Sequence, residues 1–147
     1  MLTDGIISLL SGQLGSSNQT AFTGLITALT NLTGTRVYKN QLPRGYALPS
    51  ICVHGYGDSE DYDLLGPIGV QERQIKIDIY EDPAAEDTGD VYEAVRALLI
   101  NYTGTLPDGT KVSLTKLERG MDMPFLPRAD QKGIASRALL GFTVITT

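Results

Sequence analysis

Apolar positions recur with two different periods in the middle of the chain. At residues 75, 77 and 79, isoleucines alternate with Lys76 and Asp78, and this period of two predicts a strand with one buried face. From residue 91 to residue 102, apolar residues instead recur at helical spacing, which predicts an amphipathic helix. The residues of this helical stripe are Val91, Ala94, Val95, Leu98, Leu99 and Tyr102. Together the two patterns predict a helix that lies on a sheet.

Two further helical patterns occur near the N-terminus. A short apolar cluster at residues 6–10 predicts one piece, a Gly-Ser-Ser-Asn break follows it, and residues 20–32 predict a second, amphipathic piece. An extended segment is expected at residues 36–38. Pro43 and Pro49 then oppose a helix, so the sequence predicts a connecting loop before the next strand.

The rest of the chain reads as strands and connections. A strand is expected at residues 50–56, and a long polar connection at residues 57–69 leads to the isoleucine strand. After the helix, a Pro-Asp-Gly turn introduces a strand around residues 112–116. Residues 119–137 are expected to be long and irregular, and residues 138–145 to form a closing apolar strand.

This order of elements predicts an α+β fold: a mainly antiparallel sheet of four to five strands with two helices packed on one face. The length of 147 residues suits a single domain over residues 1–147, large enough to bury a core. A single cysteine excludes an internal disulfide framework and suits a reducing cytoplasm. The start of the chain lacks the basic residues of a secretory signal, and no apolar run has the length that spans a bilayer, so no membrane association is expected.

Charge is unevenly distributed around the net value of −5. Residues 58–90 hold eleven acids and two bases, a net charge of −9, whereas residues 111–147 hold six bases and three acids, a net charge of +3. An acidic chain without a basic helix is poorly suited to grip nucleic acid, because phosphate contacts dominate that affinity. The charges either solvate loops or bring an acidic edge of one copy against a basic edge of the next.

Candidate chemistry is sparse. Cys52 and His54 project from the same face of the predicted strand, so a Cys-His nucleophile pair can be drawn, but a cysteine in an apolar strand is more often a small core residue. One His and one Cys cannot complete a tetrahedral metal site. The acidic segment that contains Asp58 lacks the ligand spacing of a calcium loop. The sequence therefore predicts neither an enzyme nor a bound cofactor or metal.

Residues 119–137 are unusually apolar for a connection of this length. They form either a loop folded onto its own core or a surface for a partner, since exposed methionines favour binding surfaces. The residues assigned to an oligomer or partner interface are Met121, Met123, Phe125, Leu126 and Arg128.

Three short patterns follow one another in a fixed order: Gly-x-Arg-Val-Tyr, then Leu-Pro before an apolar strand, then Ile-x-Ile-Asp-Ile-Tyr. The matching residues are Gly34, Arg36, Val37 and Tyr38; Leu48, Pro49, Ile51 and Val53; and Ile75, Ile77, Asp78, Ile79 and Tyr80. With the helix that contains Ala94, Val95, Leu98 and Leu99, this order makes residues 20–102 resemble the tail terminator, or tail completion, proteins of long-tailed bacteriophages.

The resemblance implies a structural virion protein that assembles in the host cytoplasm. Such a protein caps the head-proximal end of the tail tube as a homo-oligomeric ring, hexameric in this family, which ends polymerisation and offers a surface for head attachment. Its partners would be the tail tube protein and the head-tail connector protein, and DNA would pass through without specific binding. An acidic set would then form either a solvated hairpin tip or a lining of the ring lumen: Asp58, Glu60, Asp61 and Asp63.

Two alternatives belong to other roles. Small α+β rings also serve as head completion or connector proteins, because a fold alone does not fix the position in a particle. A small cytoplasmic enzyme or ligand-binding domain is the third hypothesis, and it would require a deep polar pocket around Cys52 and His54.

Overall fold

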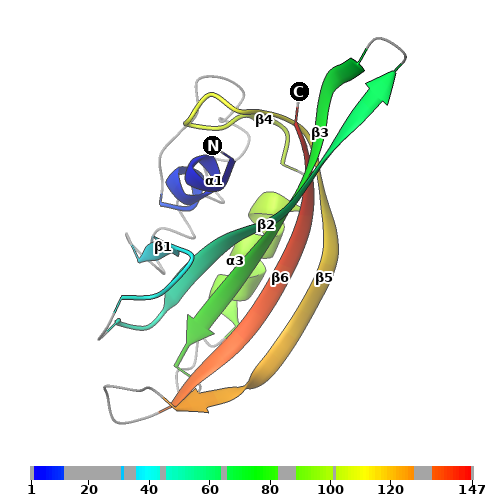
Figure 1. Ribbon diagram of the computed structural model, residues 1–147. Helices are drawn as coiled ribbons and strands as arrows, with labels where there is room; N and C mark the ends of the chain where they lie inside the picture. Colours follow the sequence, from blue (N-terminus) through cyan, green and yellow to red (C-terminus); the bar gives the residue numbers. More distant parts are fainter. Residues whose placement is uncertain are drawn as a thin grey trace.

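The computed structural model describes the chain at residues 2–11, 31, 36–43, 46–63, 66–82, 89–100, 102–127 and 134–146. The described part contains two helices and a six-stranded sheet (Figure 1). The elements in chain order are α1 (Leu2–Leu10), β1 (Val37–Lys39), β2 (Ser50–Asp63), β3 (Gly66–Glu81), α3 (Asp90–Leu99), β4 (Gly104–Thr105), β5 (Lys111–Pro127) and β6 (Ile134–Thr146).

The sheet has the strand order β1-β2-β3-β6-β5-β4. Four long strands, β2, β3, β6 and β5, form its body and are antiparallel to their neighbours. The short β1 adds to β2 in parallel, and the short β4 adds to β5 in antiparallel fashion. The expectation of a mainly antiparallel sheet is confirmed, but the sheet has more strands than the four to five expected and includes one parallel pair.

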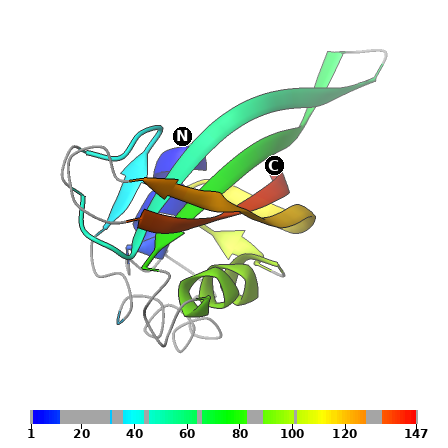
Figure 2. The same cartoon turned by 90° about the horizontal axis from the view of Figure 1, so that it is seen from below.

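Both described helices cover the same face of the sheet (Figure 2). The isoleucine strand supplies Ile75, Ile77 and Ile79 to this face, and each is at most 1% exposed. The helical stripe predicted at residues 91–102 is α3, whose Val95 and Leu98 are fully buried against the sheet. The short N-terminal helix is confirmed as α1, while the amphipathic piece predicted at residues 20–32 lies almost wholly outside the described residues.

The two segments expected to be irregular connections are largely strand, so those expectations were wrong. Residues 57–63 continue β2 and residues 66–69 begin β3, and the end of this hairpin beyond the pair of Glu60 and Gln71 extends past the other strands (Figure 2). Because this hairpin projects beyond the core, its sequence carries none of the one-sided apolar alternation that marks a buried strand. Sequence patterns that report burial cannot detect such a strand.

The segment at residues 119–137 was also expected to be irregular, yet β5 continues to Pro127 and β6 begins at Ile134. Pro124 and Pro127 both lie within β5. Pro124 lies in the register shift between Met123 and Leu126, where the regular ladder with β6 is interrupted, and a proline is tolerated at such a bulge. No described strand pairs with the outer edge of this part of β5.

A bulge near the start of β5 decides which face Leu114 occupies. Val112 is 4% exposed, but the register with β6 shifts between Val112 and Leu114, and Leu114 is 47% exposed. An extra residue in one strand reverses the alternation beyond it, so Leu114 lies on the face opposite the helices. None of the described helices is long and apolar enough to cross a bilayer.

Candidate interaction surfaces

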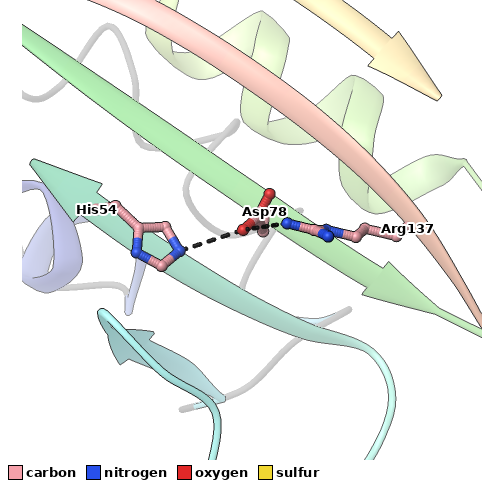
Figure 3. Close-up of polar contacts among 3 residues, drawn as sticks. All are labelled: His54, Asp78 and Arg137. Atoms are coloured by element: carbon pink, nitrogen blue, oxygen red, sulfur yellow. Dashed lines mark hydrogen bonds and ion pairs between the residues drawn. The ribbon is translucent and has the colours of Figure 1, made fainter. Parts of the chain in front are cut away.

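A buried ionic network lies on the sheet face opposite the described helices. Asp78 in β3 has a side chain 3% exposed, between His54 of β2 and Arg137 of β6. Its Oδ2 accepts a hydrogen bond from Nη2 of Arg137 at 3.1 Å and lies 3.2 Å from Nε2 of His54 (Figure 3). The network therefore ties together three neighbouring strands through one carboxylate oxygen.

Aromatic rings extend this network toward the loop before β2. The guanidinium carbon of Arg137 lies 5.7 Å from the centre of the Tyr80 ring, within the range of a cation–π interaction. Tyr46 contacts the same ring with a centroid distance of 5.9 Å and a tilt of 59°. Two buried atoms of the ion pair, Oδ1 of Asp78 and Nε of Arg137, have no hydrogen-bond partner among the described residues.

The pKa values around the network follow from burial and from Asp78. Burial, reinforced by the negative charge of Asp78, raises the pKa of the Cys52 thiol to about 11. The same two causes raise the pKa of Tyr80. Burial alone would lower the pKa of Arg137, but its hydrogen bond and ion pair with Asp78 outweigh burial and raise it.

These shifts suit a structural role better than catalysis. A nucleophilic cysteine needs a lowered pKa so that thiolate is present near neutral pH, whereas Cys52 is buried and its pKa is raised. His54 takes part in the ionic network through its contact with Asp78. Within the described residues, no group of three or more His, Cys, Asp or Glu side chains could hold a metal ion.

Only part of the predicted interface set can be placed. Met121 is 39% exposed and lies in β5 opposite Leu139, on the face away from the helices. Met123 and Leu126 also lie in β5, in register with residues 137 and 135 of β6, while Arg128 lies outside the described residues. The structure thus places this set on a strand, not in a loop, and its contact with a partner stays a prediction.

The predicted acidic set lies along the second half of β2. Asp58, Glu60 and Asp63 pair in register with Arg73, Gln71 and Gly66 of β3. The backbone of this acidic segment therefore forms one side of the projecting hairpin, and the expected loop is only its tip. Its proposed place in a lumen stays a prediction.

Sequence reasoning missed the pairing of Asp78 with Arg137, which are 59 residues apart. The available signal was an acid in the middle of an apolar strand, since a charge there needs a partner. That signal identifies Asp78 but does not identify Arg137, because the partner depends on the pairing of β3 with β6.

Comparison with known proteins gives a family. No curated protein sequence matches this chain. A chain described as "Virion of native gene transfer agent (GTA) particle" has a similar structure, with a TM-score of 0.51 and 17% identity over 80% of this chain and 84% of that chain, which shows a shared fold. The model of the family described as "Tail completion protein gp17" matches residues 24–123. This match covers most of the chain, which therefore belongs to the tail completion protein gp17 family and is a structural protein of the bacteriophage tail.

Proposed function

We propose that this protein caps the head-proximal end of the phage tail tube as a homo-oligomeric ring. The ring ends polymerisation of the tube and offers the surface to which the head attaches. The observation that carries the proposal is the family match over residues 24–123. A hexamer is the ring size that the resemblance to tail terminators implies.

The architecture supports this role because it separates the surfaces that a cap needs. A protein that ends a polymer must bind the last subunit on one side and refuse further addition on the other. Here the described helices cover one face of the sheet, and the other face carries the exposed Leu114 and Met121. The two faces thus differ in what they expose, as two different partners require.

The partners of the ring are the tail tube protein on one side and the head-tail connector protein on the other. The apolar stretch of β5 from Met121 to Leu126, with Arg128 beyond it, contacts one of them. DNA passes through the ring without specific binding, in keeping with the net charge of −5. Assembly takes place in the host cytoplasm and needs no catalysis, which the buried Cys52 thiol supports.

The test is negative-stain electron microscopy of lysates from a phage in which this gene is inactivated, with the wild-type gene supplied on a plasmid as the control. We expect overlong tail tubes without heads, restored to normal length by the plasmid. Tails of normal length beside filled, tailless heads would instead assign the protein to head completion. Intact infectious particles without the gene would overturn both roles.

A further inference from the structure

The sheet ends in two long strand edges that no described strand covers. On one side, β1 pairs with residues 51–53 of β2, and the outer edge of β2 is uncovered at residues 54–63. On the other side, β4 pairs with only Lys111 and Val112 of β5. Figure 1 shows β5 as the outermost long strand on its side of the sheet. An uncovered strand edge presents unpaired N–H and C=O groups and is a template for another strand.

Each edge contains one regular four-residue stretch bounded by bulges. In β2 the register with β3 is regular at residues 57–60, between shifts at Gly55/Gly57 and Glu60/Tyr62. In β5 the register with β6 is regular at residues 114–117, between shifts on either side. Bulges limit how far a strand edge can be extended, so pairing is possible along these two stretches and along residues 119–123 of β5, which lie between the next two shifts.

The two stretches lie at the same level of the sheet. Following the register across the strands, Gly57 pairs with Gln74, Gln74 with Thr143, and Thr143 with Lys116. A second copy displaced sideways without a slip along the strands would therefore bring its residues 57–59 beside residues 114–116 of the first.

Strand direction is also compatible. Because β2, β3, β6 and β5 alternate in direction, β2 runs antiparallel to β5. When β2 of a similarly oriented copy is placed beside β5, the antiparallel order continues across the junction. An edge of one copy that meets the opposite edge of the next is a heterologous contact, which closes into a ring when the rotation permits.

Charge favours the same contact. Residues 54–63 of β2 contain four acids and no Lys or Arg. Residues 111–119 at the start of β5 contain three bases and one acid, and the Lys116 side chain is 66% exposed. Opposite charges on two surfaces speed their encounter, whereas like charges oppose pairing between two identical edges. A β2 edge therefore meets a β5 edge more readily than another β2 edge.

We propose that residues 57–59 of β2 in one copy pair through their main chain with residues 114–116 of β5 in the next copy. This inference rests on the ring of the proposed function and names the segments that join its subunits. It places the acidic set of β2 at the contact between copies, not in the lumen of the ring.

The first experiment uses wild-type tails and a carbodiimide, which joins a lysine to a carboxylate only where the two are in contact. We expect a crosslink between Lys116 and an acid of residues 58–63, detected by mass spectrometry. Within one copy, β3 and β6 separate β2 from β5, a distance of roughly 14 Å at about 4.7 Å per strand, so such a crosslink must join two copies. Lys111, which β4 covers, is the matched control and should not crosslink to this segment.

The second experiment reverses charges in the complementation assay. Variant one carries Lys116→Glu and Arg119→Glu, and variant two carries Glu60→Lys and Asp61→Lys. We expect each to lose at least tenfold in incorporation into tails, and the chain with all four substitutions to regain most of it. Lys111→Glu is the control and should incorporate like wild type.

The outcomes separate this inference from the proposed function. If wild type restores tail length but no crosslink from Lys116 to the acidic segment forms, although other crosslinks of the protein are found in the same tails, the pairing is overturned and the cap stands. Loss of incorporation in both charge variants without recovery in the combined chain also overturns the pairing, provided that circular dichroism shows them folded. Failure of wild type to restore tail length rejects the cap itself.

Discussion

The hydroxyl of Tyr92 in α3 lies over Gly120 of β5 so closely that a side chain at residue 120 would collide with it. This contact is a close approach between the second described helix and the outermost long strand of the sheet. Glycine is required at residue 120 because the Tyr92 hydroxyl leaves no room for a side chain there, on the face that carries the buried Leu140.

We therefore predict that Gly120→Ala lowers the free energy of unfolding by about 1–3 kcal/mol, the usual cost of overpacking. Adding Tyr92→Phe should recover most of this loss, because the atoms then nearest the new methyl group lie at ordinary contact distances of 3.5 and 3.6 Å. Urea denaturation of the two single variants and the double variant measures the coupling. If the loss in the double variant equals the sum of the losses in the two single variants, the collision is absent.

The ion pair of Asp78 and Arg137 predicts a second non-additive pair. Arg137→Leu leaves a buried carboxylate whose remaining partner among the described residues is His54, and it should cost about 3 kcal/mol. Asp78→Leu combined with Arg137→Leu removes both charges and should be more stable than Arg137→Leu alone. The free energy of unfolding in urea is the measurement, and a double variant less stable than the single variant would contradict the prediction.

The raised pKa of Cys52 predicts slow alkylation of the native thiol. With the pKa moved from 9.0 to about 11, the thiolate fraction at pH 8 falls about 100-fold, and iodoacetamide should react correspondingly more slowly than with the unfolded chain. Because the folded pKa is raised, the thiol contributes stability below pH 9 that is lost as the pH rises toward 11. Cys52→Ala should lack this part of the pH dependence. Rapid alkylation of the native protein would exclude the buried, protonated thiol.

The turn between β4 and β5 predicts an acid-sensitive contribution. Although partial burial alone would raise the pKa of Asp108, hydrogen bonds from the N–H and hydroxyl of Thr110 lower it. Asp108→Ala should cost about 1 kcal/mol at pH 7. Because the folded pKa is lowered, this contribution is present above the unfolded pKa of about 4 and is lost as the pH falls further. Wild type and variant should therefore converge in acid, as thermal unfolding at several pH values would measure.

The exposed Met121 gives a prediction about assembly. Met121→Ser should leave the thermal unfolding temperature within a few degrees of wild type, because the side chain is 39% exposed, yet reduce incorporation into tails. Met121→Leu conserves volume and apolar character and is the matched control. If the serine variant unfolds early, Met121 belongs to the core; if both variants incorporate like wild type, the residue lies outside the partner contact.

The sequence by itself determined the elements whose side chains repeat with a local period. Ile75, Ile77 and Ile79 identify their strand, and Val95 and Leu98 identify α3, because burial on one face imposes a period of two on a strand and 3.6 on a helix. The class of fold and the family resemblance followed from the order of these elements, and the family match agrees with that resemblance.

Tertiary structure alone decided the features that depend on distant segments. The end of the hairpin of β2 and β3 projects past the core and leaves no pattern of burial to read. The long β5 accommodates Pro124 at the register shift between Met123 and Leu126, which depends on its pairing with β6. The partner of Asp78 is set by the register of β3 with β6, which places Arg137 beside it across 59 residues of chain. Periodicity reports which side of a segment is buried, but only the pairing of strands decides what lies next to what.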